Sequence, residues 1–185
     1  KLKKYSLGKF EIIDAHTFDY DLILKSNQNN QDTIIKNNYA VFLDEYVPYH
    51  VDLVYKGVEP DCSPEKYYPD LNSFFNYFEE KTQMKIIIAA HPSSDYKTGE
   101  NPFNNRRIVK NETKRLIQYA THVVAHASTA TSLAVIYKKP IHFVLSSKYS
   151  KSYKNLIKFH ASQFNQIPID ISQKQLSDSF SKLVD

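Results

Sequence analysis

The stretch MKIIIAAHPSSDY, residues 84–96, decides the fold of this chain of 185 residues. Its apolar run, residues 85–90, has no polar alternation, which is typical of a strand buried on both faces of a parallel sheet. The run stops at His91, Pro92 and two serines. Because Pro92 fixes its own backbone and restrains the residue before it, no helix begins there at once. We therefore expect a central strand that ends in either a turn or a binding site.

Apolar runs alternate with amphipathic stretches on both sides of this strand. The expected strands are 39–46, 85–90, 122–127, 141–146 and 167–172, and the expected helices are 67–83, 111–120, 129–139, 152–164 and 173–184. Asn111 is the expected cap of its helix, and Pro140 ends the helix before it. The pattern predicts the α/β class: a single Rossmann-like domain over residues 38–185, with a parallel sheet of about five to six strands and helices on both faces.

Residues 1–37 do not follow this pattern. Residues 25–38 are polar and low in complexity, as in a linker or a surface loop. The chain starts at Lys1 without a signal-peptide pattern. We expect residues 1–37 to be an N-terminal extension or the remnant of a connection between domains, and the chain to be a fragment of a longer protein.

Composition restricts the function classes. The lone Cys62 excludes an internal disulfide and a zinc site built on several thiolates, and suits a reducing cytoplasm. The three glycines are isolated, which excludes a glycine-rich phosphate loop. A net charge of +4, spread along the chain, argues against nucleic acid and fits small anionic ligands or an anionic membrane surface.

Three polar segments follow predicted strands: DEYVPYHVD (44–52), HPSSDY (91–96) and HASTATS (126–132). Ligands of open parallel sheets bind beyond the carboxyl ends of the strands. In the third segment a strand runs through His126 into Ser128 and Thr129, where a helix is expected to begin. Hydroxyls and helix amides there would bind a phosphate, although Ser128 or Thr129 could equally only cap the helix.

The second segment offers a comparable choice. The imidazole of His91 could donate to a phosphate oxygen or could be an ordinary histidine at a strand end. Ser93 and Ser94 could add donors or only form the turn. Arg107, or its neighbour Arg106, could form a bidentate pair with phosphate, although such arginines are usually solvated.

The first segment holds a pair of carboxylates, Asp44 and Glu45, which are weak candidates for acid–base chemistry or for sugar hydroxyls. A metal site built from Asp44, His50, His91 and His126 is a rival interpretation. No pair of these residues has the spacing of a helical two-histidine motif, so we expect no metal and no cofactor.

The segments KIIIAAHPSSDY, NPFNNRR and THVVAHASTATSLAVIYKKPIHFV together resemble the C-terminal, nucleotide-sugar-binding half of GT-B glycosyltransferases of bacterial capsule and surface-polysaccharide synthesis. In sialyltransferases and polysialyltransferases of this architecture, a His-Pro motif and a Ser-Ser or Ser-Thr motif hold the phosphate of a CMP-sugar. The resemblance implies these roles for His91–Pro92 and for Ser128–Thr129. The acidic motif of those enzymes lies in the other half and has no match here.

The resemblance implies a cytoplasmic enzyme half, on its own incomplete, that binds a nucleotide-sugar. Its partners would be a glycan or lipid-linked acceptor, a missing N-terminal Rossmann-like domain, and the inner face of the cytoplasmic membrane. Two alternatives remain open at this point. A sugar-nucleotide epimerase would use similar phosphate contacts, and a non-catalytic α/β binding or regulatory module would need no nucleotide.

Overall fold

The computed structural model describes Tyr20, residues 38–96 and residues 101–172. The chain divides into two units, Lys1–Asp32 and Thr33–Asp185, and the architecture below belongs to the second. Apart from Tyr20, the predicted extension 1–37 lies outside the described residues, and so does the predicted helix 173–184.

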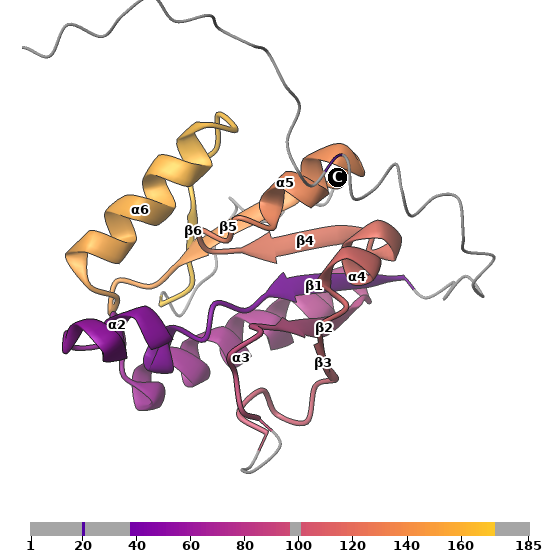
Figure 1. Cartoon of the computed structure of the whole chain (residues 1–185). Helices are drawn as coiled ribbons and strands as arrows, with labels where there is room; N and C mark the ends of the chain where they lie inside the picture. Colours follow the sequence, from indigo (N-terminus) through magenta and orange to yellow (C-terminus); the bar gives the residue numbers. More distant parts are fainter. Residues whose placement is uncertain (1–19, 21–37, 97–100, 173–185) are drawn as a thin grey trace, which may run out of the picture. The chain divides into compact units, whose positions relative to one another are not determined.

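The described residues form one parallel sheet, whose strands are β1 (Tyr39–Leu43), β2 (Lys85–Ala90), β3 (Ile108–Lys110), β4 (His122–Ala125), β5 (Ile141–Leu145) and β6 (Ile169–Asp170). The strands lie in the order β3-β2-β1-β4-β5-β6 (Figure 1). This is the strand order of the Rossmann fold, in which the direction of winding reverses between the first and fourth strands. The predicted fold class is confirmed.

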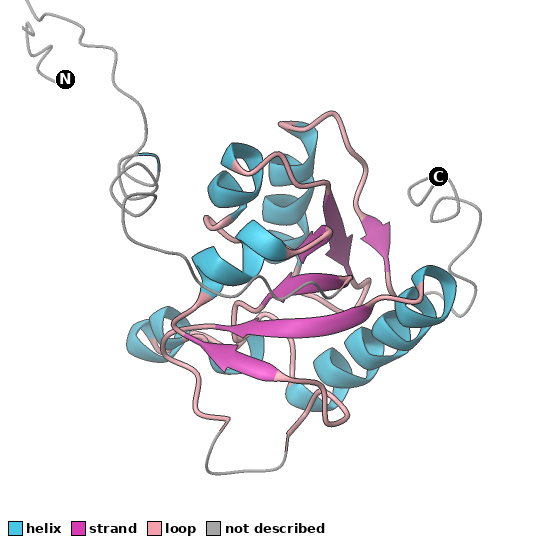
Figure 2. Ribbon diagram, turned by 90° about the vertical axis from the view of Figure 1, so that its right-hand side faces the viewer, coloured by secondary structure: helices cyan, strands magenta, loops and turns pink. Residues whose placement is uncertain are grey.

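Helices cover both faces of the sheet (Figure 2). In the described residues they are η1 (Val47–Tyr49), α2 (Val51–Lys56), α3 (Pro64–Thr82), α4 (Thr113–Tyr119), α5 (Thr131–Ile136) and α6 (Lys151–Ser162). Because side chains alternate along a strand, β1 packs against both layers. Its Phe42 contacts Phe75 of α3, with ring centroids 5.1 Å apart. On the opposite face the Tyr39 hydroxyl donates to the carbonyl of Leu116 in α4 at 2.8 Å.

Three local predictions need correction. The strand β3 is not among the predicted strands, because its three residues, two half-exposed and one exposed, are too few to show a period. Asn111 does not cap α4: it has a left-handed backbone, φ 65°, and the helix begins after Glu112. Asparagine tolerates that conformation better than most residues, so it suits the turn. The short helix α2 was also not predicted.

None of the helices in the described ranges has both the length and the apolar character that crossing a bilayer requires.

Candidate ligand site at the carboxyl edge of the sheet

The strand order brings the three polar segments together. In the parallel register, Leu43 of β1 lies beside Ala89 of β2 and Ala125 of β4. The residues that follow therefore leave the sheet at one edge, with the segment after β1 in the middle. Neighbouring strands are about 4.8 Å apart, so the two outer segments are separated by roughly 10 Å at this edge. The edge includes the point where the winding of the sheet reverses, which is the usual ligand position in such folds.

Asp44 lies at the centre of this edge and is buried. Its carboxylate accepts hydrogen bonds from the Tyr46 backbone N–H at 3.0 Å and from the Tyr96 hydroxyl at 2.8 Å. Burial raises the pKa of Asp44 to about 6, and these hydrogen bonds only partly offset it. A carboxylate held by neutral donors without a cation is costly to ionise, so Asp44 takes up a proton at a higher pH than an exposed aspartate.

Glu45 connects the segment after β1 with the segment after β4. Its Oε1 accepts a hydrogen bond from the backbone N–H of Ala127 at 2.7 Å. Burial raises the pKa of Glu45 to about 7, the Ala127 hydrogen bond lowers it, and the charge of Asp44 raises it further. The buried phenol of Tyr153 lies beside the carboxyl group, and within the described residues its hydroxyl has no partner of good hydrogen-bond geometry. Sequence alone gave no sign of the bond to Ala127.

The His91 segment forms a tight turn. The His91 carbonyl accepts hydrogen bonds from the backbone N–H of Ser94 at 2.9 Å and from its hydroxyl at 2.7 Å. The His91 Nδ1 accepts from the Ser93 N–H at 3.1 Å, which leaves Nε2 as the protonated donor of a neutral ring. The pKa of His91 is lowered, first by burial and then by His50. Of the two readings for Ser94, the turn role is the one that the contacts support, whereas Ser93 and Pro92 are exposed.

Lys110 is a cation at this edge that sequence analysis missed. It is the last residue of β3, and its Nζ donates to the Ser94 carbonyl at 2.7 Å. The one signal that could have identified it is its place at a strand end, and β3 itself was not predicted.

Ser128 and Thr129 leave β4 in a turn that precedes α5. The Ser128 Oγ accepts a hydrogen bond from the Ala130 N–H at 3.3 Å. Ser128 therefore stabilises the turn before α5 through a local bond from side chain to backbone. The amides of Thr131 and Ser132 donate to the carbonyls of Ser128 and Thr129. The first-turn amides expected to bind phosphate thus already have backbone partners in this six-residue helix. The half-buried Ser128 and exposed Thr129 remain at the edge.

His126 requires correction as a phosphate ligand, because it is fully buried. Its Nδ1 lies 2.7 Å from the Val144 carbonyl, which requires a proton on that nitrogen, and its Nε2 lies 3.2 Å from the Tyr67 hydroxyl. Burial lowers its pKa to about 4. The neutral ring joins β4 to β5 and α3, and it belongs to the core.

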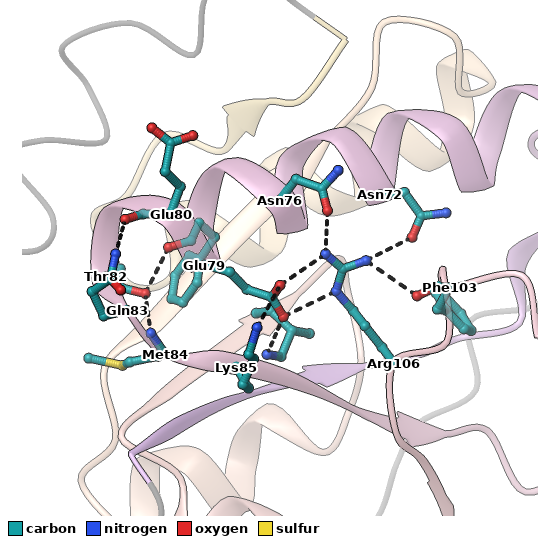
Figure 3. Close-up of polar contacts among 12 residues, drawn as sticks. Asn72, Asn76, Glu79, Glu80, Thr82, Gln83, Met84, Lys85, Phe103 and Arg106 are labelled. Carbon is teal, nitrogen blue, oxygen red and sulfur yellow. Dashed lines mark hydrogen bonds and ion pairs between the residues drawn. The ribbon is translucent and has the colours of Figure 1, made fainter.

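Arg107 also requires correction. It is exposed and precedes β3, and its carbonyl accepts from Ile88 in the middle of β2, well before that strand reaches the His91 edge. Its charge instead acts on Tyr39, at the opposite end of β1. Arg106 is buried, and Figure 3 shows its guanidinium between Glu79 and two asparagines of α3. Neither arginine reaches the carboxyl edge.

The alternative interpretation is a metal site built from Asp44, His50, His91 and His126. The rings of His50 and His91 lie 5.4 Å apart, while His126 points into the core. In the described part of the chain, no group of three or more histidine, cysteine, aspartate or glutamate side chains is arranged to hold a metal ion.

Comparison with known proteins assigns this chain to no family. No protein-family model matches the chain, and no curated protein matches it. A solved structure titled "Crystal Structure Analysis of the Glycotransferase of kitacinnamycin" is similar, with 10% sequence identity and a TM-score of 0.44. The similarity covers 86% of this chain but 37% of that one, so this chain spans well under half of that protein. At this level the similarity does not bear on substrate or activity.

Proposed function

We propose that this domain is the nucleotide-sugar-binding half of a glycosyltransferase and that the nucleotide phosphate binds at the carboxyl edge of the sheet. One observation carries the proposal: β2 and β4 flank β1, so the His91 turn and the Ser128–Thr129 turn lie on either side of the reversal point. Ligand sites of Rossmann-like sheets lie at this point, and both turns carry donors suited to an anion. The donor is a nucleotide-sugar, with CMP-linked sugars the first class to test.

The proposed chemistry is stabilisation of the departing nucleotide. As the glycosidic bond breaks, negative charge grows on the phosphate. The His91 Nε2–H and the hydroxyls of Ser128 and Thr129 would donate hydrogen bonds to it, and the Lys110 ammonium would offset its charge. Donors held in place before the reaction stabilise such charge more than water does. A second Rossmann-like domain would supply the acceptor and the group that removes its proton.

Binding measurements test the proposal. We expect one of CMP, CDP, UDP and GDP to bind with millimolar or tighter affinity in calorimetry. His91→Ala and Ser128→Ala should each weaken this binding by about tenfold to a hundredfold, because a hydrogen bond to a charged group contributes about 1.5–3 kcal/mol. His160→Ala and Ser73→Ala, which alter the same residue types on α6 and on the exposed side of α3, are the matched controls. Absence of binding to all four nucleotides contradicts the proposal.

The same experiment separates the alternatives. A non-catalytic module predicts no selective nucleotide binding. An epimerase predicts binding followed by conversion of the free nucleotide-sugar to an isomer, without an acceptor. Analysis of the nucleotide-sugar after incubation with the chain distinguishes an isomerised donor from an unchanged one.

We also propose that the outer face of α6 contacts an anionic membrane, where a lipid-linked acceptor would be reached. This helix contains three lysines and no acidic residue. Leu156 and Phe159 are 45% and 62% exposed, and Lys151 and Lys158 of the same helix are also exposed. Cations together with apolar side chains fit a membrane surface better than they fit nucleic acid. The chain should co-sediment with phosphatidylglycerol vesicles, and Phe159→Ser should reduce the bound fraction. Equal binding to uncharged phosphatidylcholine vesicles contradicts this assignment.

A further inference from the structure

The turn that is proposed to hold the phosphate already has an anionic side chain on it. The Glu45 Oε1 accepts the N–H of Ala127 at 2.7 Å, and Ala127 directly precedes Ser128 and Thr129. A phosphate bound against this turn would lie close to the Glu45 carboxylate, because Glu45 already accepts the N–H of Ala127, one of the donors nearest to the phosphate. We infer that Glu45 is a specificity-determining residue, which disfavours the nucleotide product relative to the nucleotide-sugar substrate by charge repulsion. This inference rests on the proposed function.

The groups around Glu45 do not neutralise its charge. From the end of β1 it faces Asp44, a second carboxyl group. From α6 and the turn before it, the phenols of Tyr153 and Tyr149 lie close to it. From the segment after β4 it meets the Ala127 amide, while the neighbouring His126 ring is committed to Val144 and Tyr67. Among the described residues, no lysine or arginine forms an ion pair with Glu45.

Transfer of the sugar changes the charge that Glu45 meets. In the substrate, the phosphate next to the sugar is a diester-type group with a single charge. When the bond from phosphate oxygen to sugar carbon breaks, that oxygen keeps the electron pair and the phosphate gains a second charge. A phosphate monoester loses its last proton with a pKa near 6, so the extra charge is present at neutral pH. The product therefore repels an ionised Glu45 more strongly than the substrate does.

Protonation of Glu45 should remove this discrimination. Burial places the pKa of Glu45 at about 7, so the side chain changes charge within the range in which enzymes of this kind are assayed. When protonated, the carboxyl group no longer repels a phosphate, and its O–H becomes a donor. The proton comes from solvent on binding and returns to it on release. Affinity for a doubly charged phosphate should consequently fall as pH rises through 7.

The test compares two probes and two proteins from pH 5.5 to 8.5 by calorimetry. The probes are CMP, which gains a charge in this range, and its methyl phosphodiester, which does not. UDP and its methyl diester serve as a second pair. At pH 8 the wild-type chain should bind the diester at least tenfold more tightly than the monoester. In Glu45→Gln this ratio should fall to about threefold or less, mostly because the monoester binds more tightly.

The variant Glu45→Gln keeps an oxygen acceptor for the Ala127 N–H and should fold. Glu80→Gln, which removes an exposed carboxylate on α3, is the matched control and should behave as wild type. If wild type and Glu45→Gln give the same diester-to-monoester ratio at every pH, the inference is overturned and the proposed function stands. If neither protein binds either pair of probes, the proposed function fails together with the inference.

Discussion

Two sites with fully or partly buried carboxylates lie in different parts of this fold, and only one of them has a cationic partner. At the side of α3, Glu79 faces a buried cation, with its Oε2 3.2 Å from Arg106 (Figure 3). Arg106 donates further to Asn72, Asn76 and the Phe103 carbonyl. At the carboxyl edge, Asp44 and Glu45 are held by amides and phenols, and burial raises their pKa values.

The difference indicates what each site is for. Glu79 is a partly buried carboxylate with a guanidinium partner, and this pair joins α3 to the segment before β3. Two adjacent carboxyl groups without a cation are unfavourable for stability, and such groups concentrate at functional sites. We therefore expect the Glu79 site to stabilise the fold, and we propose that the Asp44–Glu45 site responds to a proton or to a ligand.

The largest expected effect concerns the Glu79 site. Arg106→Met should lower the free energy of unfolding by about 3–5 kcal/mol, because it removes the buried cation of Glu79 and leaves only the exposed Lys85, 3.9 Å away. Arg107→Met, at the exposed neighbouring position, should change it by about 0.5 kcal/mol or less. Urea denaturation of the three proteins at pH 7 measures both values. If the two substitutions change the free energy of unfolding equally, the pair of Arg106 and Glu79 has no special role in stability, and the contrast with the carboxyl edge fails.

The second expected effect concerns the carboxyl edge and has the opposite sign. The pKa values of Asp44 and Glu45 are raised to about 6 and about 7 in the folded state. The two carboxyl groups therefore contribute favourably to folding stability in acid, and this contribution is lost as pH rises through their pKa values in the folded state. Asp44→Asn and Glu45→Gln should each raise the free energy of unfolding at pH 8 by up to about 3 kcal/mol, with less than additive effects in the double variant. A gain of the same size at pH 4 would contradict this assignment.

The fold could be predicted from sequence where the signal is long and apolar. Residues 86–90 of β2 form an unbroken apolar run, and His142 alone interrupts the apolar residues of β5, because the sheet is covered on both faces. The helix α3 repeats its phenylalanines at helical spacing. The strand β3 could not be predicted, because its three residues are defined by pairing with β2 and not by their own pattern.

The candidate site was predictable as a set of segments but not as a set of side chains. Strand ends locate the turns after β1, β2 and β4, since the carboxyl ends of parallel strands share an edge. The orientation of each side chain depends on tertiary packing. His91 and His126 each directly follow a strand, but the register places them one position apart, and His126 is fully buried whereas His91 is not. Likewise, no local feature of Glu45 indicates its bond to an amide that is 82 residues away.

A third effect should appear at acidic pH, in the dependence of the free energy of unfolding on pH. Burial lowers the pKa values of His126 and His142 to about 4. These lowered values contribute stability above the pKa of the unfolded chain, near 6.5, and that stability is lost as pH falls. Raised carboxyl pKa values make stability fall as pH rises, so Asp44 and Glu45 oppose the histidines. The free energy of unfolding of the wild type should therefore change little between pH 5 and 7. In the double variant Asp44→Asn, Glu45→Gln, each histidine should lower stability by about 2 kcal/mol at pH 5 relative to pH 7.5. A profile as shallow as that of wild type would mean that the carboxylates do not offset the histidines.

The smallest expected effect is the sharpest test of where the ligand binds. Lys110 lies at the carboxyl edge and bonds to the Ser94 carbonyl, whereas the charge of Arg107 acts at the other end of β1. Lys110→Met should weaken nucleotide binding about threefold to tenfold and reduce its salt dependence, since a partly solvated cation contributes modestly. Arg107→Met should change the affinity by less than about twofold, because a charge beyond a Debye length is largely screened. Calorimetry at two salt concentrations separates the variants. The reverse ranking would move the anion to the opposite end of the sheet, where no segment after β1 or β4 could reach it.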